Sequence, residues 1–342
     1  MRDILPAGAA TEGDQAALRQ ELLGYKPASL TFKKQKKTGT WGDGILGLGV
    51  LRTPTSKDVG TIAQYRFLAE MGVPLEERAL RLAERVFFRL LSRDEDPSLL
   101  FEYSKAAKGN PELVNWSRGM MRQAATAALA HAGHLEDPRV RGAAHRVASD
   151  ISQYLRSELA EKPFIRKGPR TVLHPQATPP TILAVATVAY MPSLQRERAG
   201  FVERLGAYLA QPAPKRPFAI LLGKRAVKPT YELLGDPLVA DSAGRPKDLL
   251  LALYWIELLA RLGQLNSSQT AQKILGRLIS ECDGQGVWNP PNLRTFPKSP
   301  SRLAEFYYPL EVDGKNPEHR KTDVTFRLAL IAKLAGWTLE FT

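Results

Sequence analysis

The chain has 342 residues, 44% of them hydrophobic and 24% charged, a composition typical of a folded chain and not of a disordered one. Forty-eight Lys and Arg against 35 Asp and Glu give a formal net charge of +13, which favours an anionic partner. The single cysteine, Cys282, excludes a disulfide framework and a Cys-rich zinc or iron–sulfur site.

The first segments of the chain show no secretory pattern. Residues 1–10 lack an apolar core, and no later run of about eighteen apolar residues occurs, so we expect a cytoplasmic chain without a membrane span. The amphipathic segment 12–24 carries Leu18 and Leu22 on one face and predicts a first helix. A basic run follows at 33–37.

Five apolar runs then recur along the chain, and each ends in Gly or Pro. Being apolar nearly all round, they predict buried inner helices, with a left-handed glycine closing most of them. Asp58, Asp248 and Asp323 stand near the starts of three runs, where a carboxylate can accept hydrogen bonds from free N–H groups as an N-cap. The predicted inner helices cover 58–72, 118–133, 179–191, 248–263 and 323–336.

Amphipathic segments follow four of these runs after short turns and predict outer helices over 76–91, 137–159, 195–210 and 267–282. Alternating buried and half-buried helices predict an all-α fold: an α/α toroid of about five inner and five outer helices, with essentially no sheet. The last inner helix has no partner after it, so we expect residues 12–24 to supply one and close the ring. The whole chain, 1–342, then forms a single domain.

The connections from each outer helix to the next inner helix are long, roughly 92–117, 160–179, 211–247 and 283–322. Because long ordered loops on one face of a fold often carry function, we expect the working face at the N-terminal ends of the inner helices.

Two strings carry a family resemblance: Thr38-Gly-Thr-Trp-Gly-Asp-Gly44 and Asp283-Gly-Gln-Gly-Val-Trp288. Both resemble the Gly-x-Trp core of the repeats in squalene cyclases and prenyltransferase β-subunits, members of the α/α-toroid superfamily. That resemblance implies a Gly/Trp segment just before an inner helix, and a toroid fold.

The acidic motifs of those enzymes are missing, because neither Asp-x-Asp-Asp nor Asp-Asp-x-x-Asp occurs. His131 and His134 lie three apart at the end of an inner helix. A metal would need a third ligand there, so we interpret them as residues that complement the helix dipole. We predict neither a metal nor a cofactor, and the sequence does not decide whether the chain is an enzyme.

The candidate site residues lie on the inner helices and on the face with the long connections. Glu257 and Arg261, four apart in the most apolar run, predict a buried ion pair, and a buried carboxylate can act as a general acid. Weak catalytic candidates are Asp43, Glu257 and Asp323. Candidate ligand-binding residues are Trp41, Tyr65, Arg66, Arg118, Tyr254, Trp288, Asn289, Tyr307 and Arg327.

Positive charge concentrates in 160–247, which holds fourteen Lys and Arg against six Asp and Glu, and in 33–37. If both segments lie on one rim, they would focus field on an anionic ligand. Our first hypothesis is an anionic-ligand site in the ring mouth, for a diphosphate lipid or an acidic polymer. The alternative is a non-catalytic basic module that binds nucleic acid or docks in a larger assembly.

Overall fold

The computed structural model describes residue 17 and residues 20–47, 60–93, 95–291, 299 and 318–338. Helices account for 58% of the structure and strands for 9%, which confirms a chain that is more than half helical. Among the described residues, no helix is long and apolar enough to cross a membrane.

All five predicted inner helices are present, with ends shifted by a few residues. Their bounds are α3 Gly60–Glu70, α6 Pro111–Ala132, α8 Ile182–Ala189, α11 Leu249–Arg261 and α13 Glu318–Leu334. The start of α6 lies seven residues before the expected position, because Asn110 caps it and Pro111 takes the first turn. Asp248 caps α11 as predicted, accepting from the Leu251 N–H at 3.1 Å.

Asp323 is not an N-cap, which corrects the prediction. Helix α13 begins at Glu318, so Asp323 lies inside it, buried one turn before Arg327. A residue inside a helix faces N–H groups that already bond to the preceding turn, and it therefore has none to cap. Asp58 lies outside the described residues.

The glycine stops are confirmed in detail. Gly72, Gly133, Gly263 and Gly336 all have positive φ, between +66° and +102°. After each one, the next N–H bonds to a carbonyl five residues back, as in Val73 to Leu68 and His134 to Leu129. This pair of features is the Schellman motif, so four inner helices end in one repeated geometry.

The outer helices also match the predicted segments, except that one is broken in two. They are α4 Arg78–Ser92, α7 Pro138–Leu155, the pair α9 Pro192–Glu197 and α10 Ala199–Leu209, and α12 Gln269–Ser280. Arg198 adopts a non-helical φ of −132° between α9 and α10, which breaks the segment predicted as one helix over 195–210.

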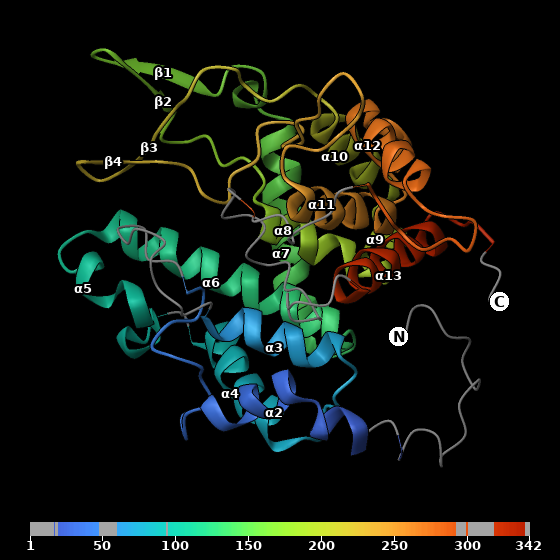
Figure 1. Cartoon of the computed structure of the whole chain (residues 1–342). Helices are drawn as coiled ribbons and strands as arrows, with labels where there is room; N and C mark the ends of the chain where they lie inside the picture. Colours follow the sequence, from blue (N-terminus) through green and yellow to red (C-terminus); the bar gives the residue numbers. More distant parts are fainter. Residues whose placement is uncertain are drawn as a thin grey trace.

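Each inner helix packs on the next one in the chain, in the order α3, α6, α8, α11 and α13 (Figure 1). The outer helix α4 packs on α3 and α6, α7 packs on α6 and α8, and α12 packs on α11. An ion pair from Arg327 of α13 to Glu70 of α3 links the last described inner helix to the first. The buried residues of all these helices form one hydrophobic core.

Two small antiparallel hairpins correct the expectation of essentially no sheet. Strand β1 Phe164–Lys167 pairs with β2 Arg170–Leu173, and β3 Ile220–Leu222 pairs with β4 Arg225–Val227. Each hairpin turns through two residues, of which the first is a glycine with positive φ: Gly168 at +59° and Gly223 at +64°. Gly-x turns of this kind match the twist of the flanking strands, so Gly-Pro and Gly-Lys between apolar runs are the signal that was missed.

Short helical segments complete the fold. Helix α2 Lys26–Lys34 precedes the first Gly-x-Trp string and was not predicted. The others are η1 Pro97–Tyr103, α5 Ser104–Ala107, η2 Glu158–Ala160 and η3 Leu265–Ser267.

The two Gly-x-Trp strings occupy equivalent positions. Each forms a tight loop after a helix, closed by a bridge between residues six apart, Gln35 with Trp41 and Cys282 with Trp288. The backbone N–H of each tryptophan donates to a threonine of the following inner helix, Thr61 at 3.1 Å and Thr325 at 2.9 Å. Both threonines lie eleven residues before a Schellman glycine, so helices α2 and α12 are counterparts.

The segment 12–24 is described only at residue 17 and from residue 20 onwards, where it is helical. Leu22 is buried and its side chain lies near Gly72, at the end of α3. Closure of a ring by this segment stays a prediction.

Candidate functional site

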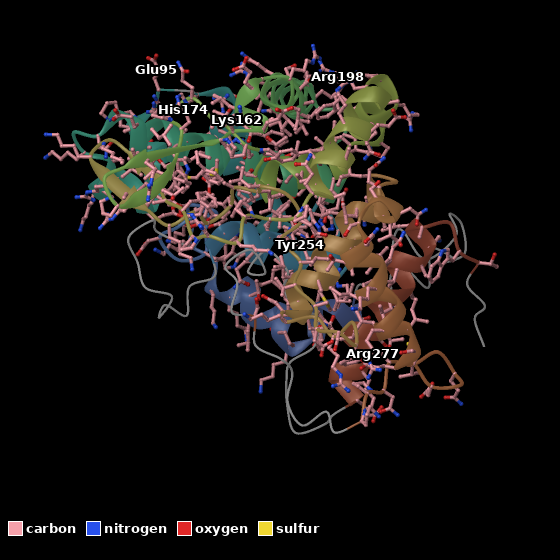
Figure 2. All side chains as sticks on the ribbon, turned by 90° about the horizontal axis from the view of Figure 1, so that it is seen from above. Glu95, Lys162, His174, Arg198, Tyr254 and Arg277 are labelled. Atoms are coloured by element: carbon pink, nitrogen blue, oxygen red, sulfur yellow. The ribbon has the colours of Figure 1, made fainter. Side chains whose placement is uncertain are left out.

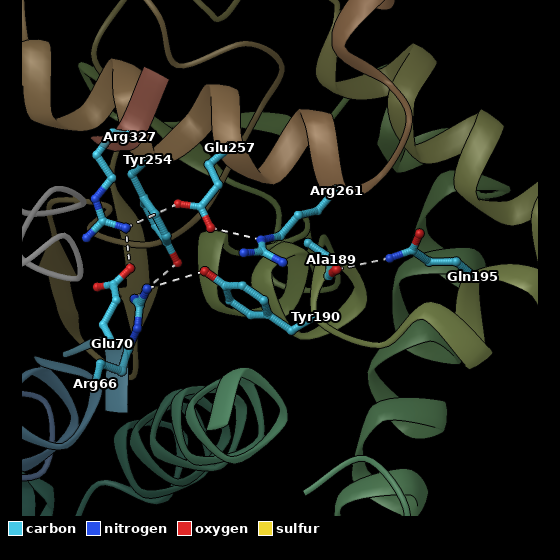
Figure 3. A network of polar contacts seen from close by, with 9 residues as sticks. All are labelled: Arg66, Glu70, Ala189, Tyr190, Gln195, Tyr254, Glu257, Arg261 and Arg327. Atoms are coloured by element: carbon cyan, nitrogen blue, oxygen red, sulfur yellow. Dashed lines mark hydrogen bonds and ion pairs between the residues drawn. The ribbon is translucent and has the colours of Figure 1, made fainter. Parts of the chain in front are cut away.

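A network of buried charged and phenolic side chains joins four inner helices (Figure 3). Arg66 of α3 donates to the hydroxyl of Tyr254 at 3.4 Å and to that of Tyr190, at the end of α8, at 3.3 Å. Its guanidinium lies 5.1 Å from the centre of the Tyr254 ring, close enough for a cation–π contact. Arg66 is therefore held by neutral partners on two other helices.

The carboxylates of this network are shared between arginines. Glu257 accepts from Arg261 Nε at 2.8 Å, which confirms the predicted pair, and lies 3.7 Å from Arg327 Nη1. Arg327 also pairs with Glu70. Because a charge removed from water needs a counter-charge, these contacts hold the guanidinium groups of Arg261 and Arg327 in the interior.

Burial and neighbouring charges together shift the pKa values in the network. Burial alone would raise the pKa of Glu70, but the charge and hydrogen bond of Arg327 outweigh it and lower this pKa to about 2. Burial, with the nearby Arg66, lowers the pKa of His131 to about 3. Burial followed by Glu257 raises the pKa of Tyr190, and burial raises that of Tyr254, so both phenols stay protonated.

His131 therefore does not complement the helix dipole as predicted, because a histidine with so low a pKa is neutral near pH 7. Its ring packs edge-on against Tyr190, with centroids 4.8 Å apart. His134 points elsewhere and contacts Glu84 of α4 at 2.8 Å. Among the described residues, no group of three His, Cys, Asp or Glu side chains is placed to hold a metal ion.

Four predicted site residues meet in this network: Arg66, Tyr254, Glu257 and Arg327. Tyr65 does not, because its hydroxyl donates to Glu84 on the outer helix α4 at 2.9 Å. Trp41 and Trp288 are buried in the core, each only 3% exposed, and anchor the loops described above.

The remaining candidates are dispersed. Asp43 is exposed beside Lys36, Asn289 is exposed, Arg118 is half-buried on α6 and Asp323 is buried in α13. Tyr307 lies outside the described residues.

Glu70 and His131 belong to the network but were missed, and the glycine stops contain the signal for them. Arg66 and Glu257 both lie six residues before their glycines, and Glu70, His131 and Arg261 all lie two residues before. Four residues apart, these two positions share one face of a helix. An alignment of the apolar runs on their terminal glycines, and not on their first residues, would have placed these five side chains at two equivalent positions.

A second concentration of charge is fully exposed. The two hairpins and their flanks, residues 162–173 and 214–228, form what we call the basic arm, which projects from the helices on one side (Figure 1). Leu173 N–H donates to Ala219 C=O at 2.8 Å and Ala219 N–H to Thr171 C=O at 3.2 Å, so the hairpins are joined side by side. Phe164 and Phe218 pack against each other, with centroids 5.1 Å apart.

The arm carries nine exposed basic side chains and no acidic residue; the acids nearest to it along the chain are Glu161, just before its first segment, and Glu232, four residues after its second. Among the residues that the structure describes, none of the nine forms an ion pair. They are Lys162, Arg166, Lys167, Arg170, Lys215, Arg216, Lys224, Arg225 and Lys228.

A cavity of about 1110 Å³ lies between the arm and helices α6 and α7, on the face that carries two of the long connections. Its walls include Trp116 and Met120 of α6, Gln153 of α7 and the proline-rich stretch 174–181. None of the predicted site residues that the structure describes lines it. In Figure 2, Lys162 and His174 lie next to the hairpins, whereas Tyr254 lies in the middle of the molecule.

A smaller cavity of about 300 Å³ adjoins the large one, since Gly119, Gln123, Val147 and Asp150 line both. Three arginines from α6 and α7 line it, and we call it the arginine pocket; they are Arg122, Arg139 and Arg146. Their charge is partly neutralised, because Arg139 pairs with Asp137 at 2.7 Å and Asp150 also lines the pocket, whereas Arg146 is exposed.

The two basic segments of the sequence do not form one rim, which corrects that expectation. Residues 33–37 end α2 and lie on α4, where Gln35 donates to the Ala79 carbonyl at 2.7 Å. In Figure 1, α2 and the hairpins lie at opposite ends of the molecule. The repeat places them apart, because α2 precedes the first inner helix and the arm precedes the third and fourth.

No protein-family model matches this chain, and neither a curated protein nor a solved structure shows significant similarity to it.

Proposed function

We propose that this chain binds nucleic acid through the basic arm. The single observation that carries the proposal is the set of nine exposed Lys and Arg side chains on two joined hairpins that themselves contain no acidic residue. A polyanion gains affinity when such charges displace the counterions of its phosphates.

The shape of the arm supports the same proposal. Basic side chains flank both hairpin turns, Lys167 and Arg170 at one and Lys224 and Arg225 at the other. A two-stranded ribbon is narrow enough to follow a nucleic-acid groove or a bent backbone. Contacts from Lys and Arg to phosphates position a protein on a nucleic acid without reading the base sequence. We therefore expect the arm to show little preference between base sequences.

The ring-mouth hypothesis has weaker support. Of the arginines proposed for a diphosphate or an acidic polymer, Arg66 and Arg327 are buried and already contact Tyr254, Glu70 and Glu257. The third, Arg118, is half-buried on α6 and makes no contact in that network (Figure 3). A ligand at Arg66 and Arg327 would have to displace their partners, whereas the arm is free of such competition. The nucleic-acid alternative is therefore our conclusion.

The test compares two five-charge variants by fluorescence anisotropy with a labelled 20-nucleotide strand. The arm variant replaces Arg166, Lys167, Arg170, Lys224 and Arg225 by Gln. The matched control removes the same charge on the far side, where Lys26, Lys33, Lys34, Lys36 and Lys37 are exposed. Each lost phosphate contact lowers the log–log salt slope by about 0.7 for a single strand, so the arm variant should lose up to about 3.5.

Equal weakening of both variants would assign the binding to net charge and not to the arm. Absence of binding to the unaltered chain at low salt would overturn the proposal in favour of docking to a protein assembly.

For the architecture, we propose a closed α/α toroid. The sequential packing of α3, α6, α8, α11 and α13, the ion pair from α13 back to α3, and the paired tryptophan loops support it. Small-angle scattering of the full chain tests this arrangement, because an open superhelix would have a larger radius of gyration than a ring.

A further inference from the structure

The large cavity lies between two basic surfaces. The basic arm supplies one wall through Lys167 and residues 220–223, and the arginine pocket adjoins the other end at Gly119 and Gln123. A strand that passes from the arm to the arginine pocket would therefore cross the cavity. Its phosphates would meet the basic arm on one side of the crossing and the exposed Arg146 of the arginine pocket on the other.

The cavity itself is unsuited to phosphate. Its wall carries three carboxylates, Glu112, Asp150 and Glu232, against Lys167 and His174. Carboxylates repel phosphates but accept hydrogen bonds from the amino groups of bases, and the amides of Asn115 and Gln153 can both donate and accept. The charges therefore favour a nucleic-acid backbone on the basic arm and the arginine pocket, and bases inside the cavity.

The apolar part of the wall suits a flat ring. Trp116 is held in place by its Nε1–H, which donates to Glu232 at 2.9 Å, and its ring contacts Tyr103 and Tyr231, each with centroids 6.1 Å apart. A fixed aromatic ring lets a base stack at little cost in ordering, and stacking on aromatic side chains is worth about 1–3 kcal/mol per base. Prolines 175, 179 and 180 add rigid apolar surface.

The volume of the cavity limits which form of nucleic acid can enter it. Ordinary small-molecule sites have volumes of about 300–1,000 Å³, and this cavity, at about 1110 Å³, is slightly larger than that range. It has room for unpaired nucleotides but not for a duplex.

We propose that this cavity takes unpaired bases of a single-stranded nucleic acid, whose backbone contacts the basic arm on one side and the arginine pocket on the other. The proposal rests on the proposed function, which it deepens by naming single-stranded nucleic acid as the ligand. It assigns to the residues around Trp116 a role that charge alone does not supply.

The experiment uses the full chain and an oligonucleotide with one 2-aminopurine, as a single strand and as a duplex of the same sequence. We expect the single strand to bind at least about tenfold more tightly, with a change in 2-aminopurine fluorescence that the duplex does not show. Trp116 supplies the stacking surface of the cavity wall, so Trp116→Leu removes it without altering charge. This variant should abolish the single-strand preference and leave duplex affinity and the salt slope unchanged.

The control is Trp337→Leu, an exposed tryptophan outside the cavity wall. If Trp116→Leu does not fold, Gln153→Leu, which removes an exposed amide of the cavity wall, takes its place. Equal affinity for single strand and duplex overturns the inference, and so does a single-strand preference that persists in the cavity variant. If the arm variant still loses binding in these cases, the proposed function stands. Loss of all binding in the unaltered chain would instead overturn the proposed function itself.

Discussion

The central network and the basic arm use the same side chains in opposite ways. In the network, Arg66 and Arg327 are buried and contact a phenol or a carboxylate from other helices, while Arg261 is largely buried and pairs with Glu257 of its own helix. On the arm, nine basic side chains are exposed and none pairs with a described residue. The first set of charges is neutralised inside the molecule, and the second is available to an external partner.

This contrast shows why a net charge of +13 is a poor guide to a site. Counting charge along the sequence does not separate arginines that stabilise the fold from those that can bind. The separation depends on whether a counter-charge from a distant part of the chain reaches the side chain. Removing charges from each region in turn tests whether the two sets of charges differ in this way.

The largest effect should come from Arg327→Ala. Arg327 contacts the carboxylates of both Glu70 and Glu257, and this change removes that shared partner. Breaking a buried ion pair costs about 3–5 kcal/mol of the free energy of unfolding. Arg225→Ala, at the tip of the arm, should change the free energy of unfolding by less than about 0.5 kcal/mol. Guanidinium unfolding followed by circular dichroism measures both, and similar losses would erase the distinction between the two regions.

An intermediate effect should appear as a pH dependence. His131 has a pKa lowered to about 3 in the folded chain, so the unfolded chain binds one more proton as the pH falls below about 6.5. Stability from this group is fully present above pH 6.5 and is lost as the pH falls towards 3, by about 1.4 kcal/mol per pH unit. His131→Phe should flatten the curve between pH 6 and about pH 5; an unchanged slope there would mean that His131 is solvated.

The smallest effect should come from salt. Buried pairs are screened little, while the repulsion among exposed arm charges falls as ionic strength rises. Raising NaCl from about 0.05 to 0.5 M should therefore leave stability unchanged or raise it by less than about 1 kcal/mol. A marked loss of stability with salt in thermal unfolding would show that the network is open to solvent.

The sequence predicted the inner and outer helices because their signals are local. Apolar runs, capping residues such as Asp248 and the glycine stops act within one or two turns, and the structure has them where they were expected. Helix starts were less predictable: Asp323 resembles a cap, but the stretch before it continues the helix back to Glu318. The hairpins were missed because each offers only three or four residues per strand.

The site was harder to predict because its parts meet only in three dimensions. The pair of Glu257 and Arg261 could be predicted from their spacing of four residues. The pair of Glu70 and Arg327 could not, because these residues lie 257 positions apart in the sequence. The cavity beside the arm combines residues of α6, α7 and two loops, none of which is distinctive in sequence. Nothing local marks Trp116 or Thr178 as part of one wall.

The pair formed by Arg327 and Glu70 joins residues 257 positions apart, and this separation has a consequence for how the chain unfolds. In a linear repeat protein each unit contacts only its neighbours, so terminal units can fray one at a time. Here, detaching α13 would strip a counter-charge from α3 and from α11 at once. Fraying from the C-terminal end is therefore penalised at the N-terminal end, which favours a single cooperative transition over stepwise loss of hairpins.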